Sequence, residues 1–161
     1  MSANDDVIHV INRTALIENL LNQAIEKYCS PRKEVFPFFW NVILDSSIMT
    51  MGSKIKVAMA IAQETGFKLK DDSLHDLSMY RNAFAHHAVD AHPMLLVAKD
   101  PEQDEVRYML HIIKYSGKIQ QISRDEALKK FDTCYDQAKQ SLVEFCKAIV
   151  ANIESEKYGA I

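Results

Sequence analysis

Glycine and proline are scarce in this chain, with four of each among 161 residues. Few points therefore force an element to break, so long elements are expected, helices before strands. Long hydrophobic runs are missing too, since no apolar stretch approaches the roughly 18 residues that a membrane span needs. The acidic start, MSANDD, lacks the basic and apolar segments of a signal peptide. We expect a single domain over residues 1–161 that is cytoplasmic and makes no membrane contact.

Cysteine is sparse and shows no pairing pattern. Cys29, Cys134 and Cys146 are odd in number and form neither a CxxC pair nor a zinc-like spacing. Such thiols fit a reducing cytosol, where they act as small apolar side chains. We therefore expect no disulfide.

A large excess of charge of one sign is absent as well. Apolar residues make up 48% and charged residues 25%, which is typical of a globular chain rather than a disordered one. The formal net charge is −3, so the molecule as a whole does not attract nucleic acid or an anionic membrane. Any contact with a polyanion must be local.

The short motifs of several enzyme and cofactor classes are also missing, namely a glycine-rich phosphate loop, GxSxG and HExxH. A metal interpretation of His86, His87 and His92 is weak. Adjacent histidines point to different faces, and no carboxylate or cysteine stands at a ligand spacing. We expect neither a metal nor another cofactor.

Hydrophobic periodicity predicts a mainly α-helical fold. Apolar residues recur at spacings of three and four, and a Ser-Pro pair at 30–31 ends the first such stretch because the residue before proline leaves the αR region. An antiparallel bundle of four to five helices is expected. The predicted helices cover residues 5–29, 37–46, 53–65, 74 to a point before Pro93, and 124–155.

Local capping signals set these boundaries. Ser53 and Ser73 are predicted N-caps, with Ser73 and Asp76 at capping-box spacing, and Gly66 is a predicted left-handed terminator. The full capping box SRDE at 123–126 opens the longest helix, and residues 157–161 are expected to be a frayed tail.

Between the last two helices the composition changes to β-branched and aromatic residues. Runs at 94–98, 106–115 and 118–122 are separated by turn-like segments, including Ser116-Gly117. We predict a three-stranded antiparallel β-meander over about 94–122, inserted before the long C-terminal helix.

An aromatic segment at 35–44 contains three of the seven phenylalanines and the only tryptophan. Such a cluster is usually a core anchor, although a platform for stacking bases is the alternative. Lys54 and Lys56, near the start of the next helix, are interpreted as solvated side chains.

Polar chemistry is concentrated in YRNAFAHH at 80–87. The apolar stripe formed by Leu74, Leu77 and Phe84 leaves a step on or beside Arg81, and a buried guanidinium needs a partner or a ligand. Asn82 and His86 are roughly 40° apart around a helix, whereas Arg81 and His86 are roughly 140° apart. This geometry favours a site that a second copy of the helix completes.

An inert helix end is the competing interpretation. Histidines in a last helical turn are favourable for the helix dipole, and Asp76 or Asp45 could neutralise Arg81. Nothing in composition alone excludes it.

The run RNAFAH at 81–86 resembles the motif of HEPN domains, in which an arginine and a polar residue precede a histidine by four to six places. GSKIKVA at 52–58 and the spacer that follows it look like the mannitol operon repressor-like branch of these proteins. The resemblance covers residues 52–87. It implies a helical bundle that dimerises with its motif helices face to face and, in catalytic members, cleaves RNA without a metal.

Carried to matching positions, the resemblance implies the following roles. His86 would be the general acid or base, and Arg81 would hold the scissile phosphate. Asn82 would orient the phosphate or His86, and its neighbours Tyr80 and His87 are further candidates for substrate contact. The predicted β-meander departs from a plain bundle, which weakens transfer from the minimal toxins of the family.

Three hypotheses follow. The chain is an RNA-cleaving toxin or defence component with RNA as substrate and a protein partner such as an antitoxin, a non-catalytic regulatory or interaction module, or a structural helical dimer. The acidic net charge weighs against the first, because RNA cleavage calls for local basic surface. Beyond the motif, that surface would come from Lys54, Lys56, Lys68 and Lys70.

Overall fold

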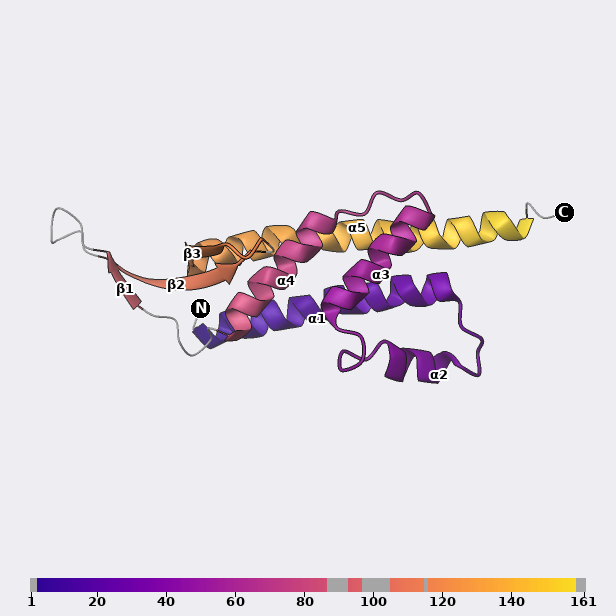
Figure 1. The fold of residues 1–161 in the computed structure, drawn as a ribbon, viewed down its shortest axis with the longest axis horizontal. Helices are drawn as coiled ribbons and strands as arrows, with labels where there is room; N and C mark the ends of the chain where they lie inside the picture. The colour runs from indigo at the N-terminus through magenta and orange to yellow at the C-terminus, as the bar shows by residue number, and fades with distance from the viewer. Residues whose placement is uncertain (1–2, 87–92, 97–104, 115, 159–161) are drawn as a thin grey trace.

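Two long helices frame the fold. The structure, a computed structural model, describes residues 3–86, 93–96, 105–114 and 116–158. Helices α1 (Ala3–Cys29) and α5 (Arg124–Tyr158) lie side by side and point in the same direction (Figure 1). Their polar contacts advance together along both helices: Asp6 with Arg124, Arg13 with Asp132, and Leu20 with Cys146.

Helix α4 (Asp71–His86) packs on α1 and α5 and runs antiparallel to both. At its start the backbone N–H of Lys70 donates to Ser141 Oγ at 3.2 Å, and near its end the Phe84 ring lies 5.3 Å from the Arg124 guanidinium. The α1–α5 pair is therefore parallel, whereas the sequence predicted an antiparallel arrangement. The long connection from α1 to α5 permits this, because only a short loop forces neighbouring helices to be antiparallel.

One apolar core holds these helices together. It lies between α1, α4 and α5, with α3 (Met51–Glu64) crossing over it. Burial of each large side chain contributes roughly 1.5–3 kcal/mol, so packing rather than local propensity fixes α4 in place. The predicted apolar faces supply its members, among them Ile17, Leu21, Leu77, Phe84, Phe131 and Phe145.

The ends of α3 test the capping predictions. Thr50, not Ser53, is the N-cap, and its side chain accepts from the backbone N–H of Ser53 at 3.3 Å. Gly66 has φ +69°, which confirms the predicted left-handed terminator. Phe67 follows it and packs 5.1 Å from the ring of Phe145.

Helix α4 begins three residues earlier than predicted, at Asp71. Ser73 is buried inside its first turn, where the hydroxyl donates to the Lys70 carbonyl at 3.0 Å, so the predicted capping box at Ser73 is wrong. Before α5 the predicted cap is confirmed, because Ser123 Oγ accepts from the backbone N–H of Glu126 at 3.3 Å. α5 continues to Tyr158, past the predicted end of the helix.

The aromatic segment does not form a core anchor. It folds as a short helix α2 (Phe36–Phe38) and a π-helical turn η1 (Phe39–Ile43), neither of which buries a residue. Figure 1 shows α2 outside the α1–α5 pair. Phe38 is 57% exposed, and Phe36 stacks on Trp40 at 5.9 Å. Leu44, just after η1, is buried in the core, and Phe39 and Trp40 pack against its edge while remaining partly exposed.

The sheet is small and antiparallel, with strands β1 (Pro93–Leu96), β2 (Glu105–Ile113) and β3 (Ile119–Ser123) in the order β1-β2-β3. One half of β2 pairs with β1, and the other half, from Met109 to Ile113, pairs with β3. The described sheet is therefore two strands wide at every level. The predicted three-stranded meander is not confirmed.

Candidate functional site

The predicted site residues occupy different environments at the end of α4. Tyr80 is 7% exposed and belongs to the core. Arg81 is half-buried, and Asn82 and His86 are exposed. His87 lies outside the described residues, as does His92.

Tyr80, rather than Arg81, fills the step in the apolar stripe. The buried positions Leu77, Tyr80 and Phe84 are spaced three and four apart, which is an unbroken helical face. Arg81 stands roughly 100° further around the helix, at the edge of that face. The predicted stripe omitted Tyr80 because tyrosine, with its hydroxyl, was not grouped with the apolar residues. Arg81 is therefore beside the core and not in it.

The Arg81 side chain is held by its neighbour. Nη1 donates to Asn82 Oδ1 at 3.0 Å. This bond uses the acceptor of the Asn82 amide and leaves its N–H groups as donors. Guanidinium and amide together present a cluster of donors, which is the complement of a phosphate or another anion.

Of the two carboxylates proposed to neutralise Arg81, Asp45 is engaged elsewhere. Asp45 accepts from the backbone N–H and the hydroxyl of Ser47, and these bonds, together with the charge of Lys54, lower the pKa of Asp45. Asp76 lines a pocket beside Tyr80. Among the residues that the structure describes, no carboxylate forms an ion pair with Arg81.

His86 and Asn82 share the exposed side of α4. They are four residues apart, so their side chains are neighbours one turn from each other. Arg81 reaches this side from the edge through its bond to Asn82. The last two turns of α4 thus present a cation, an amide and an imidazole to solvent, although no contact joins Arg81 to His86 directly within the described part of the chain.

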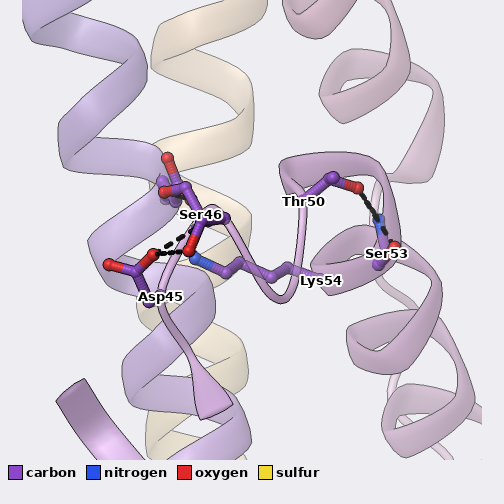
Figure 2. A network of polar contacts seen from close by, with 7 residues as sticks. Asp45, Ser46, Thr50, Ser53 and Lys54 are labelled. Carbon is purple, nitrogen blue, oxygen red and sulfur yellow. Dashed lines mark hydrogen bonds and ion pairs between the residues drawn. The ribbon is translucent and has the colours of Figure 1, made fainter. Parts of the chain in front are cut away.

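The prediction that Lys54 is a solvated surface lysine is wrong. It is 1% exposed, and Nζ donates to Glu18 Oε1 on α1 at 2.6 Å. Ser46 donates to the same oxygen at 2.8 Å. Figure 2 shows the lysine extending from α3 under the loop that carries Asp45 and Ser46. The group ties this loop and α3 to α1, and it removes Lys54 from any basic surface.

A pocket of ≈ 620 Å³ opens between α4, the β2–β3 hairpin and α5. Its wall carries both apolar and charged groups from distant parts of the chain, among them Asp76, Tyr80, Lys114, Gln120, Lys130 and Cys134. Of these, Tyr80 alone was a predicted site residue. The others carry no shared motif, because the fold alone brings them together.

Burial sets the protonation of two of these groups. It raises the pKa of the Tyr80 hydroxyl, and burial together with Asp76 raises the pKa of the Cys134 thiol. Cys134 is therefore a neutral thiol rather than a nucleophile at neutral pH. Lys130 carries a 2.7 Å ion pair with Glu126 on the surface, and this partner raises its pKa. The pocket offers recognition groups and no activated nucleophile.

Two other site classes find no support in the described part of the chain. It contains no cluster of three or more His, Cys, Asp or Glu side chains able to hold a metal. None of its helices combines the length and apolar character that a membrane crossing demands.

Comparisons with protein-family models, curated proteins and solved structures gave no match to this chain.

Proposed function

We propose that the chain is a HEPN-like endoribonuclease that works without a metal, with RNA as substrate and Arg81 and His86 as its catalytic residues. One observation carries the proposal. Arg81 is half-buried, is oriented by Asn82, and forms no ion pair with a described carboxylate. A partly desolvated cation in that state attracts an anion. The predicted inert helix end needed Asp76 or Asp45 to neutralise this charge.

The chemistry follows from the groups on this face. The RNA 2′-oxygen attacks the adjacent phosphorus, the bond to the 5′-oxygen breaks, and a cyclic phosphate forms. His86 takes the proton of the 2′-hydroxyl or returns one to the leaving oxygen, a role that suits an imidazole because its ring nitrogens can accept and donate a proton. Arg81 binds the phosphate and offsets the charge that develops on it, while the amide N–H groups of Asn82 orient it.

We further propose that the site is shared by two copies of the chain. Arg81 and His86 are roughly 140° apart around α4, so one helix does not aim both at the same phosphate. Two α4 helices packed face to face would bring the arginine of one copy to the histidine of the other. The site would then be repeated by two-fold symmetry.

Cleavage of structured RNA in the presence of a chelator tests the enzyme. We expect His86→Ala to lower the rate by about 10²–10⁴-fold and Arg81→Ala by about 10²–10³-fold, with folding unchanged by circular dichroism. His75→Ala, on the same helix, is the matched control and should retain activity. Absence of wild-type cleavage above background would remove the proposal.

Mixing the two inactive variants tests the shared site. In a composite site, a dimer of one Arg81→Ala and one His86→Ala chain has one of its two sites intact. After equal mixing and exchange of subunits, we expect activity to recover to about a quarter of wild type. If each chain carries its own complete site, every dimer in the mixture stays inactive. Wild type taken through the same exchange is the control, and if it stays active while the mixed variants show no activity, the composite site is excluded.

The alternative is a non-catalytic interaction module, and one observation favours it. Apolar side chains are exposed on and after α2, including Phe36, Phe38, Val42 and Ile48, and they provide contact area for a protein partner such as an antitoxin. Growth after expression separates the two functions. A toxin arrests growth when wild type is expressed alone and not when His86→Ala is, whereas a binding module makes no such distinction.

A further inference from the structure

We propose that the pocket between α4, the β2–β3 hairpin and α5 binds one nucleotide, through its phosphate and its base. The proposal rests on the proposed function in one respect, since we place this nucleotide in the RNA strand whose cleavage His86 carries out. The same chemistry is offered by a free nucleotide. The experiments below separate the two sources.

The pocket has the size and mixed polarity of a small-molecule site. Its volume of ≈ 620 Å³ lies within the range of about 300–1,000 Å³ in which such ligands bind. Met79 and the ring of Tyr80 give it an apolar wall from α4. A nucleobase buries its flat faces against walls of this kind.

Two lysines at the rim supply the positive charge. Lys114 lies beside the hairpin turn and Lys130 on α5, and both line the pocket. Lys130 pairs with Glu126 at 2.7 Å, but both side chains are about half exposed, so the pair is worth only about 0–1 kcal/mol and yields readily to a phosphate. Asp76 also lines the pocket, so attraction of a phosphate rests on Lys114 and on Lys130 once it exchanges Glu126 for the ligand.

Hydrogen-bonding groups for the base or the ribose also line the pocket. Gln120 offers an amide and Thr133 a hydroxyl, and Asp76 offers an acceptor for an amino group or a sugar hydroxyl. Cys134 and Tyr80 also line the pocket, and neither brings reactive chemistry of its own. These features suit recognition rather than catalysis.

The position of the pocket on α4 connects it with the proposed catalytic face. Met79 and His86 are seven residues apart, which places them on nearly the same side of the helix. At 1.5 Å per residue they are separated by about 10 Å along its axis. A strand whose scissile phosphate lies at His86 therefore reaches the pocket within a few nucleotides.

Binding is measured with the His86→Ala protein, which keeps the pocket and leaves RNA intact. A fluorescent single-stranded oligoribonucleotide is titrated by anisotropy at several salt concentrations. We expect Lys114→Ala to weaken binding about fivefold and to lower the salt slope by about one. Lys118→Ala is the matched control. It removes the same charge from the same exposed hairpin, but Lys118 does not line the pocket.

A second variant obstructs the pocket without changing its charge. Thr133 is exposed on α5, so Thr133→Trp should fold and place an indole in the cavity. We expect at least a tenfold loss of binding, with helix content by circular dichroism unchanged. Equal affinity for RNA of Thr133→Trp, Lys114→Ala and the parent would overturn the pocket as a nucleotide site.

Titration with uridine or adenosine monophosphate, followed by amide NMR shifts around Gln120, distinguishes the source of the ligand. Shifts that saturate with the monophosphate and disappear in Thr133→Trp support a site for a free nucleotide. If the monophosphate causes no shifts, but RNA causes shifts that disappear in Thr133→Trp, the pocket is a subsite for an RNA strand. If binding depends on the pocket but the wild type cleaves no RNA, this inference stands and the proposed enzyme is removed. Wild-type cleavage with no binding effect at Lys114 or Thr133 would do the reverse.

Discussion

Removing Glu18 from its ion pair with buried Lys54 should destabilise the fold more than removing Lys54. Lys54 is 1% exposed, and its ammonium lies 2.6 Å from Glu18 Oε1. Glu18→Gln leaves this charge buried without its partner, a change that typically costs about 3–5 kcal/mol. The hydrogen bonds from Ser47 lower the pKa of Asp45 most, and the charge of Lys54 lowers it further. The Asp45 carboxylate therefore still attracts Lys54 when Glu18 is neutral. We therefore expect the lower end, about 3 kcal/mol.

The opposite substitution should cost much less. Lys54→Met keeps most of the buried side-chain volume and removes the charge that required a partner. Glu18 is then left 22% exposed, where water and Ser46 still satisfy its carboxylate. Replacement of a buried charge by an apolar group of similar size is often neutral, so we expect a loss of about 1 kcal/mol or less.

Urea unfolding followed by circular dichroism measures both changes. A loss of about 3 kcal/mol corresponds to a fall in Tm on the order of 10 °C for a chain of this length. Glu126→Gln is the matched control, because its pair with Lys130 is exposed and should contribute no more than about 0.5 kcal/mol. If Glu18→Gln costs no more than Glu126→Gln, the argument from a buried, unpaired charge is refuted. If Lys54→Met costs as much as Glu18→Gln, attraction within the pair outweighs the cost of burying it.

Two further predictions concern backbone and titration. Gly66→Ala should lower the free energy of unfolding in urea by about 1–2 kcal/mol, because its φ of +69° strains an L side chain. No atom lies within 4 Å of an added Cβ, so the cost comes from the backbone alone. Gly52→Ala in α3 is the control and should be neutral or slightly stabilising. Burial, foremost, raises the pKa of Tyr80, so its contribution to stability is complete below the ordinary tyrosine pKa of about 10 and is lost as pH rises through the higher folded value. Tyr80→Phe should remove that alkaline loss above about pH 10, and an unchanged pH profile would contradict the sign.

The elements that sequence periodicity predicted well are those that bury one regular stripe. α1 ends at Cys29 and α5 starts at Arg124, as predicted, because a Ser-Pro pair and a complete capping box act locally. Gly66 ends α3 for a similarly local reason. Local rules failed where two residues compete for one function. Thr50 caps α3 in place of Ser53, and Ser73 is drawn into the first turn of α4 by burial.

Tertiary placement accounts for the larger errors. Aromatic density at 35–44 predicted a core anchor, but the core was already filled by residues of α1, α4 and α5, and Phe38 remains exposed. Nothing near Lys54 in sequence indicates that Glu18, thirty-six positions earlier, accepts its charge. A parallel α1–α5 pair is likewise invisible to periodicity, because a helical stripe is the same whichever direction its neighbour runs.

Arg81, Asn82 and His86 lie near the end of one helix, as the sequence predicted, but the predicted burial of Arg81 was wrong in its cause. Sequence suggested that Arg81 interrupts the stripe, so desolvation alone would demand a ligand. Tyr80 occupies that step, and a one-residue change of phase turns a side chain roughly 100° around a helix. Arg81 thereby retains access to water in the single chain, and its full desolvation would come only when a second α4 covers it. The charge would then require a phosphate at the moment the composite site forms. Dimerisation and substrate binding would accordingly favour each other by the same free energy.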